Sequence, residues 1–196
     1  MPNVRIGFAK RDITPEAETF GSFRLSGVKR HSGVHDPLFA HALVIEVAQR
    51  RCLLVSVDVV AIPTEPATEL RSRLGRMLGI EPSAVLLAAT HTHNGPETLN
   101  EEADGRIDVW PALEQAFLDA AAEAAGRMME ARMRFAGGDL PVAINRYQHR
   151  LNIGQNTVDP RLDVLAFEDP GGRHLGVLYH YAAHPTCAMR AESRIS

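Results

Sequence analysis

The sequence predicts an α/β (α+β) fold in which helices pack on a mixed β-sheet that contains hairpins. Two pairs of apolar, β-branched runs are each interrupted by a short turn, at residues 49–51 and 169–172, and such pairs are typical of β-hairpins. Amphipathic helical patterns occupy residues 64–78 and 108–133, between the strand patterns. This order of elements favours one sheet with helices packed on it.

Strand patterns dominate the first third of the chain. Residues 4–13 are short and partly alternating, which predicts a strand. Residues 16–36 are rich in Gly, Ser and charged side chains, which predicts a long irregular loop. Residues 41–62 contain the two apolar runs of the first hairpin. We expect Cys52, which lies in the second of these runs, to pack in the core.

The middle of the chain predicts helix, strand, helix and strand. Thr64 begins a helix with an apolar face, and Gly79 is suited to end it. Residues 83–90 form a continuous apolar run, which is typical of a strand covered on both faces. An apolar stripe from Leu113 to Met128 indicates the second helix, and residues 133–138 return as a strand.

Length and composition limit the class of protein. The 196 residues, of which 45% are hydrophobic and 23% charged, fit one globular domain, and we assign residues 1–196 to it. The net charge of −3 offers no basic surface for nucleic acid. No apolar span is long enough to cross a bilayer, and no signal-peptide core is present, so we expect a cytoplasmic protein. Cys52 and Cys187 form no disulfide framework.

Two histidines, His91 and His93, follow directly after the apolar run of residues 83–90. On an extended strand, residues two apart point to the same face, about 6.6 Å apart, so both rings can converge on one small volume. Imidazole is a common ligand for zinc, and ligand sites gather at strand ends in α/β sheets. The pair indicates half of a metal site or, alternatively, a strand that happens to end in polar residues.

A third histidine, His184, again ends an apolar strand and precedes a loop. Three histidines with one open position form the familiar hydrolytic zinc site. His180 lies about 13 Å back along an extended strand, so we expect it in the core or behind a ligand. The other histidines fall in predicted loops, beside turns or at a strand edge, where solvated side chains are expected: His31, His35, His41, His149 and His174.

Two further side chains carry weaker signals. Asp58 ends an apolar strand, where it either supports a metal ligand or forms the turn at the strand end. Arg146 keeps its charge and presents a planar fork of donors. Beside a metal it could steady a developing oxyanion; on its own it is a surface ion-pair residue.

Six segments follow one another along nearly the whole chain: GFAKRDITP, HDPLFAHALVIEV, LLVSVD, ATHTHNGPE, INR and HYAAHPT. In this order they resemble the neutral and alkaline ceramidase family, at the N-terminal catalytic domain of the non-lysosomal enzymes. The specific part of the resemblance is THTH-x-GP followed by a distant HPT.

The resemblance implies a zinc amidohydrolase that splits a lipid amide, N-acylsphingosine, into a fatty acid and a sphingoid base. It implies His91 and His184 as zinc ligands and His93 as a catalytic histidine beside the metal. It also implies Arg146 as an arginine that assists at the reacting centre. Spacing alone would make His93 a ligand, so both roles for His93 stay open.

The chain departs from the family's pattern at several positions. Asn94 and Glu97 stand where the family often has Ser and Gly, and His41 stands where arginine is expected. A related, more polar N-acyl lipid is therefore an alternative substrate. Family chains run well beyond HPT, so the chain resembles the front part of a longer enzyme, and we expect little activity from residues 1–196 alone. The histidine pattern is also compatible with a metallohydrolase of another family, or with a catalytically inactive metal-binding or assembly module.

Overall fold

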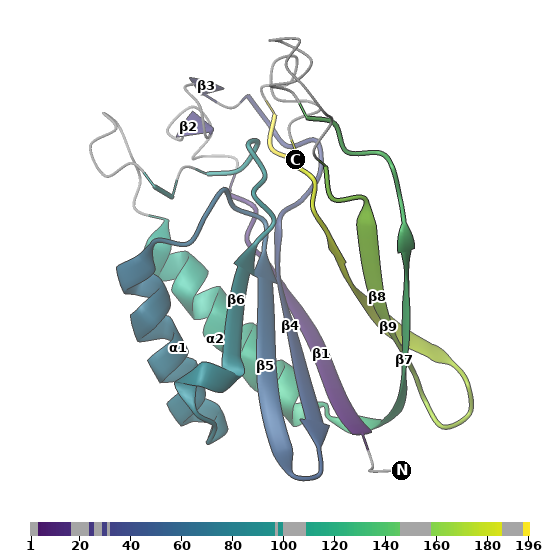
Figure 1. The fold of residues 1–196 in the computed structure, drawn as a ribbon. Helices are drawn as coiled ribbons and strands as arrows, with labels where there is room; N and C mark the ends of the chain where they lie inside the picture. Colours follow the sequence, from purple (N-terminus) through teal and green to yellow (C-terminus); the bar gives the residue numbers. More distant parts are fainter. Residues whose placement is uncertain are drawn as a thin grey trace. The chain divides into compact units, whose positions relative to one another are not determined.

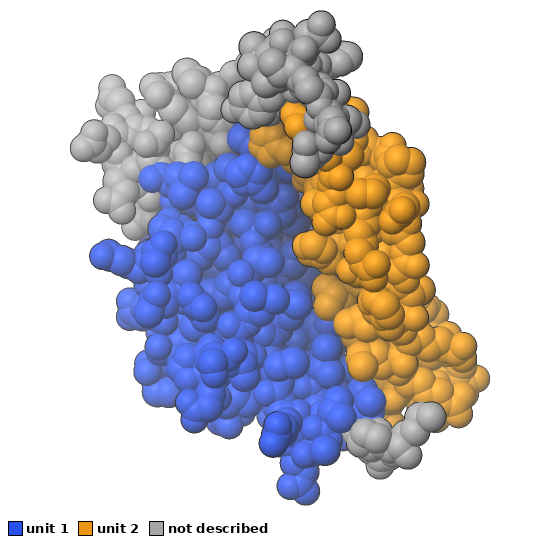
Figure 2. Space-filling view, in the orientation of Figure 1, with its two compact units in different colours: residues 1–129, 185–196 blue, residues 130–184 orange. Residues whose placement is uncertain are grey.

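The computed structural model describes residues 4–16, 24–25, 29–30, 32–96, 98–99, 109–145, 158–185 and 194–196. The chain divides into two compact units (Figure 2). Unit 1 comprises Met1–Met129 and Pro185–Ser196, and unit 2 comprises Glu130–His184.

The sheet of unit 1 is mixed. Its strands, in spatial order, are β6 (Val85–Ala89), β5 (Arg50–Val57), β4 (Phe39–Val47) and β1 (Val4–Asp12). β1, β4 and β5 pair antiparallel, whereas β5 and β6 pair parallel. A parallel pair needs a crossover connection, and the helix α1 lies on that connection. The predicted mixed sheet is therefore confirmed.

The first predicted hairpin is confirmed as β4 and β5, with a turn that begins one residue earlier than expected. The turn residues Ala48 and Gln49 have φ angles of 48° and 63°. A type I′ turn requires positive φ at both positions, and its twist matches that of the flanking strands.

Cys52 is exposed on β5, so the expectation that it packs in the core is wrong. Successive side chains on a strand point to opposite faces. Leu53 and Val55 are buried on the core side, which leaves Cys52 on the other face.

Two helices cover one face of the unit 1 sheet (Figure 1): α1, Thr64–Leu78, and α2, Trp110–Gly126. Their side chains share one core with the strands, and Leu70, Leu74 and Phe117 are among its fully buried members.

Gly79 ends α1 as predicted. Its φ of 65° lies in the left-handed region, where glycine has no steric cost. The Ile80 N–H then donates to Gly75 O at 2.9 Å, which satisfies a carbonyl of the last turn.

The second helix is shorter than the predicted 108–133. α2 ends at Gly126, and β7 begins at Met129. From Met129 to Phe135, apolar residues recur at every second position, so this stretch also fits the period of a strand. Glycine is a poor helix former, and Gly126 lies where the helix stops.

β6 forms an edge of the unit 1 sheet. Val85 is buried, but Leu86, on the opposite face, is 58% exposed. The expectation of a strand covered on both faces is therefore wrong within the described residues.

Unit 2 contains an antiparallel sheet whose strands, in spatial order, are β7 (Met129–Asp139), β8 (Arg161–Glu168) and β9 (His174–Tyr181). The second predicted hairpin is confirmed as β8 and β9. Asp169 organises its turn, because Oδ1 accepts a hydrogen bond from the Arg173 N–H at 2.8 Å.

The predicted irregular loop at residues 16–36 contains a short antiparallel pair, β2 (Arg24–Leu25) and β3 (Lys29–Arg30). Parts of this loop lie outside the described residues. In the described part of the chain, no helix has both the length and the apolar character needed to cross a bilayer. The cellular location stays a prediction.

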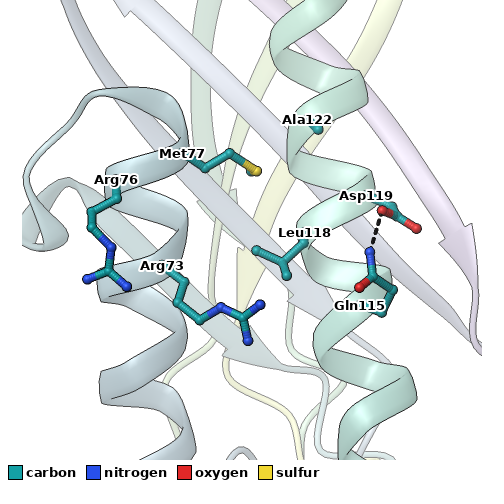
Figure 3. Close-up of a pocket in the computed structure, with 7 residues that line it drawn as sticks. All are labelled: Arg73, Arg76, Met77, Gln115, Leu118, Asp119 and Ala122. Atoms are coloured by element: carbon teal, nitrogen blue, oxygen red, sulfur yellow. Dashed lines mark hydrogen bonds between the residues drawn. The ribbon is translucent and has the colours of Figure 1, made fainter.

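A hollow of about 390 Å³ lies between α1 and α2 (Figure 3). Arg73, Arg76 and Met77 line it from α1, and Leu118 and Asp119 are among the α2 residues that face them. The hollow contains none of the predicted site residues, so we do not assign the predicted chemistry to it.

Candidate metal centre

The segment that follows β6 carries His91 and His93 and is hydrogen-bonded to the segment that follows β5. The Thr90 N–H donates to Val57 O at 2.9 Å, and the His91 N–H donates to Val59 O at 3.1 Å. The hydrogen bonding between the parallel strands β5 and β6 thus continues past their carboxyl ends. This is the position where ligand sites gather in α/β sheets.

The His91 ring is held in one orientation and one tautomer. Its Nδ1 lies 2.6 Å from Val60 O. Because a carbonyl oxygen only accepts, Nδ1 must carry the hydrogen. In the neutral ring, Nε2 then keeps the lone pair that a metal ligand needs. A backbone carbonyl behind the ring is a common support for metal-binding histidines.

The backbone of His91 is strained. Its φ of 63° lies in the left-handed region, which costs a residue with a Cβ atom roughly 1–2 kcal/mol. Such strain persists where surrounding bonds enforce it, and it is concentrated at functional sites. Here the bonds to Val59 and Val60 enforce it.

Two of the three predicted histidines lie side by side in unit 1. The rings of His91 and His93 have centroids 4.8 Å apart and planes at 86°. His184 is the last residue of unit 2, so its place beside them stays a prediction.

The donor set limits the kind of ion that fits. Imidazole suits zinc, copper, iron and nickel, whereas magnesium and calcium prefer oxygen ligands. A zinc ion held by three protein ligands keeps a fourth position for water. His91 and His93 could thus contribute to a site for a metal ion, and their chemistry fits zinc.

The structure corrects the expectation for one histidine. His180 is exposed on β9, opposite Asp163 of β8, so its placement in the core is wrong. His184 follows the end of β9 by three residues instead of ending the strand itself.

Asp58 closes the end of the β4–β5 pair. Its Oδ2 accepts a hydrogen bond from the Phe39 N–H at 2.9 Å, and its own N–H donates to Phe39 O at 3.0 Å. The sequence left open whether Asp58 supports a metal ligand or forms the turn at the strand end. These contacts support the second role.

Some of the remaining predicted residues lie within the described part of the chain and others lie outside it. His35, His41 and His174 are exposed, as expected for solvated histidines. The predicted residues that lie outside the described residues are His31, Glu97, Arg146, His149 and Cys187.

Sequence reasoning did not identify Asn94 as a buried neighbour of the histidines. It is 5% exposed, and its Nδ2 has no hydrogen-bond partner within the described part of the chain. A buried donor without a partner costs about 1–3 kcal/mol, and such groups often mark a site where a water or a ligand supplies the bond. The only sequence signal was its position directly after His93.

Comparison with known proteins supports the family suggested by the sequence. The family model "Neutral/alkaline non-lysosomal ceramidase, N-terminal" matches residues 4–196. The neutral ceramidase of Pseudomonas aeruginosa is 30% identical over 212 aligned residues, which cover 98% of this chain and 32% of the relative.

Two solved structures share the fold. The neutral ceramidase structure from Pseudomonas aeruginosa superposes with a TM-score of 0.83 at 26% identity and covers 100% of this chain and 34% of that one. A structure described as ceramidase complexed with C2 gives a TM-score of 0.79 at 26% identity, over 100% of this chain and 33% of that one. The chain therefore spans about a third of the length of these relatives. With the family model matched along almost all of its length, the chain belongs to the neutral/alkaline non-lysosomal ceramidase family, at the N-terminal domain.

Proposed function

We propose that the chain is the N-terminal part of a zinc-dependent amide hydrolase that cleaves N-acylsphingosine, or a related N-acyl lipid, into a fatty acid and a sphingoid base. The observation that carries the proposal is the pair of neighbouring histidines, His91 and His93, in a chain that the ceramidase model matches over residues 4–196. The substrate class comes from the relatives, which are named as neutral ceramidases.

His91 and His184 would hold the zinc ion. For His91, the bond from Nδ1 to Val60 O supports this role, because it leaves Nε2 free of hydrogen. A bound zinc ion supplies Lewis acidity and lowers the pKa of a water molecule toward neutrality.

His93 would move the protons of the reaction. It would take a proton from the attacking water and give it to the leaving amine. The observation that supports this role is that its ring lies beside that of His91. Arg146, as the family resemblance implies, would bind the negative charge that develops on the amide oxygen.

The alternative role for His93 is that of a third zinc ligand. The two roles make different predictions for the His93→Ala variant. A ligand role lowers zinc affinity as strongly as His91→Ala does. A proton-transfer role keeps most of the zinc affinity and removes turnover.

One observation favours a second candidate function. The chain spans about a third of the length of its relatives, yet all three predicted histidines, His91, His93 and His184, lie within it. A module that binds a metal ion and does not turn over substrate by itself is the alternative.

The deciding experiment measures zinc content and amide hydrolysis on the same preparations of wild type, His91→Ala and the control His174→Ala, whose side chain is exposed. We expect one zinc ion per chain in wild type and control, and loss of zinc in His91→Ala. Hydrolysis of short- and long-chain N-acylsphingosines, by this chain or by one extended to the relatives' length, would support the hydrolase. Zinc without hydrolysis in either chain would support the binding module, and a wild type that binds no zinc would contradict both.

A further inference from the structure

His93 lies at the centre of a short turn that a side chain closes. The Thr92 Oγ1 accepts a hydrogen bond from the Asn94 N–H at 3.2 Å. Threonine hydroxyls commonly stabilise turns by bonding to the backbone two residues on. This bond restricts the backbone of His93, and with it the direction of the ring.

Ser196 bonds to both flanks of this turn. The Thr92 hydroxyl donates to Ser196 O at 2.7 Å, across 104 positions of sequence. The Ser196 N–H donates to Asn94 O at 3.1 Å. A hydroxyl has one donor and two acceptor positions, so Thr92 can hold the turn closed and bind Ser196 at the same time.

The segment formed by Ile195 and Ser196, which we call the clamp segment, is itself anchored in unit 1. The Ile195 side chain is fully buried and packs against Leu38 and Ile13. Its N–H donates to Gly33 O at 2.9 Å.

Two polar contacts complete the anchor on residues 35–36. The His35 N–H donates to Ile195 O at 2.8 Å, and the Ser196 hydroxyl donates to Asp36 Oδ2 at 2.9 Å. His35 Nδ1 also lies 2.8 Å from the same Asp36 oxygen. Hydrogen bonds from His35 and Ser196 lower the pKa of the Asp36 carboxyl, so it accepts these bonds as a carboxylate at neutral pH.

We propose that the clamp segment is a positioning element for His93: through Thr92 and Asn94, it sets how His93 is presented to the metal ion. This proposal rests on the proposed metal site. His91 provides an internal contrast, because its backbone and ring are held by Val59 and Val60 and not by the clamp segment. A loosened clamp should therefore disturb His93 more than His91.

Two variants test the clamp segment: Thr92→Val at the histidine turn and Ile195→Ala at the anchor in unit 1. Thr92→Val keeps the shape of the side chain and removes the hydroxyl, whereas Thr92→Ser keeps the hydroxyl. Ile195→Ala loosens the anchor and leaves the residues of the histidine turn themselves unchanged. The matched control is Thr68→Val, which removes a hydroxyl that donates to Thr64 O at 2.9 Å within α1.

The first measurement is backbone amide exchange by NMR on the 196-residue chain without metal. Loss of one hydrogen bond corresponds to about a fivefold change in a local opening equilibrium. We expect Ile195→Ala to speed exchange of the Asn94 amide by about fivefold. Thr92→Val removes both bonds of the hydroxyl, so we expect a larger effect there, about 25-fold where the two losses add. The His91 amide should change less in both variants. Thr92→Ser and Thr68→Val should leave both amides close to wild type.

The second measurement is metal binding, by chelator competition with zinc and by the visible absorption spectrum of bound Co²⁺. The result expected for zinc affinity depends on the role of His93. If His93 moves protons and is not a ligand, Thr92→Val should alter the Co²⁺ spectrum and keep most of the zinc affinity. If His93 is the third ligand, Thr92→Val should also lower zinc affinity by about tenfold, because removing a group that orients a metal ligand typically lowers metal affinity by 10- to 100-fold. Thr92→Ser should restore the wild-type result in either case.

The outcomes separate this inference from the proposed function. If the Asn94 amide exchanges in Ile195→Ala as it does in wild type, the clamp does not hold the turn and the inference is wrong, whatever the zinc affinity. If Thr92→Val speeds exchange of the Asn94 amide but leaves both zinc affinity and the Co²⁺ spectrum unchanged, the turn is held but it does not position His93 for the metal ion. That result would refute the proposal as well. If wild type binds no zinc, the proposed function fails together with the metal role of the clamp, while the exchange data still decide whether the turn is held.

Discussion

The contact between β1 and α2 makes Gly7 the position where a single methyl group should be most costly. A Cβ atom added to Gly7 would lie 1.8 Å from Ala124 O and 3.2 Å from Met128 Cγ. Real Cβ atoms essentially never approach closer than 3.0 Å. The closest obstacle is a backbone atom of α2, so the helix or the strand must move by at least 3.0 − 1.8 = 1.2 Å.

The expected cost follows from that displacement. Overpacking a core costs about 1–3 kcal/mol, which the loss of glycine's flexibility in the unfolded chain offsets by about 0.4–1 kcal/mol. Because the obstacle is backbone, we take the upper end, a net loss of about 2 kcal/mol. For a chain of this size, 1 kcal/mol corresponds to about 2–4 °C in Tm, so Gly7→Ala should lower Tm by about 4–8 °C.

Thermal unfolding followed by circular dichroism tests this, with Gly138→Ala as the matched control. Gly138 also lies in a strand, β7, but nothing lies within 4 Å of a Cβ atom placed there among the described residues. We expect the control to keep the Tm of wild type or exceed it slightly. Equal Tm values for Gly7→Ala and Gly138→Ala would show that the close approach of β1 and α2 is not a feature of the folded protein.

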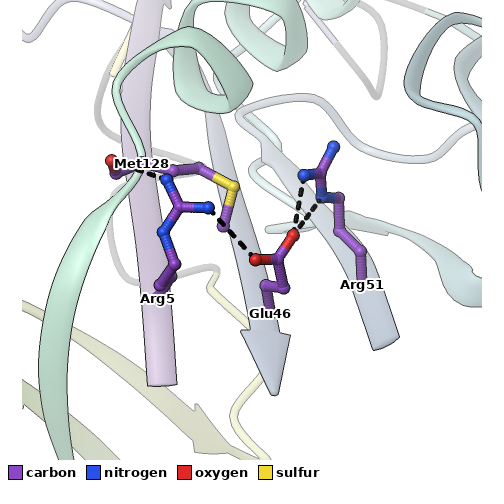
Figure 4. Close-up of polar contacts among 4 residues, drawn as sticks. All are labelled: Arg5, Glu46, Arg51 and Met128. Atoms are coloured by element: carbon purple, nitrogen blue, oxygen red, sulfur yellow. Dashed lines mark hydrogen bonds and ion pairs between the residues drawn. The ribbon is translucent and has the colours of Figure 1, made fainter. Parts of the chain in front are cut away.

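Three further predictions concern the site and the surface. His91→Ala should bind zinc at least tenfold more weakly than wild type, as measured by chelator competition; an unchanged affinity would remove it from the metal site. Arg146→Ala, in a chain extended to the relatives' length, should lower turnover far more than zinc content, and normal turnover would exclude Arg146 from the reaction. Glu46 accepts hydrogen bonds from Arg51 and Arg5 (Figure 4), and these arginines, Arg51 foremost, hold its pKa below the ordinary 4.5. Since the folded-state pKa is the lower one, the stabilisation is present above pH 4.5 and is lost as the pH falls through the folded value. Glu46→Gln should therefore lower Tm at pH 7, and the difference from wild type should shrink in acid; a difference that does not depend on pH would contradict this.

Local sequence patterns predicted the hairpins and the end of α1 because these features depend on interactions between residues that are close in the sequence. Alternation and turn residues are sufficient to define the β4–β5 and β8–β9 hairpins, and Gly79 is sufficient to end α1. The boundary between α2 and β7 was missed because the apolar residues near it fit the period of a helix and that of a strand. In such a stretch, packing decides the outcome, and packing is not visible in a window of sequence.

In the candidate site, too, some features could be predicted from local sequence and others could not. The histidine pair could be singled out because it directly follows an apolar run. The extended-strand geometry expected for the pair is wrong, since β6 ends at Ala89 and His91 has a left-handed φ. The supports of both histidines could not be predicted, since Val60 O and Ser196 O are backbone groups that every residue possesses. The left-handed φ of His91 was equally hidden, because histidine gives no special signal for it.

The supports of the two histidines come from different parts of the sequence. His91 depends on residues 59–60, and the turn around His93 depends on residues 195–196. In the unfolded chain neither support exists, so the proposed metal site is a property of the folded state. A metal ion that binds only the folded state stabilises it by an amount that grows with the logarithm of the metal concentration. Zinc affinity would therefore report on the folding of these supports. Turnover would be a less direct measure, because under the proposed function it would also depend on Arg146.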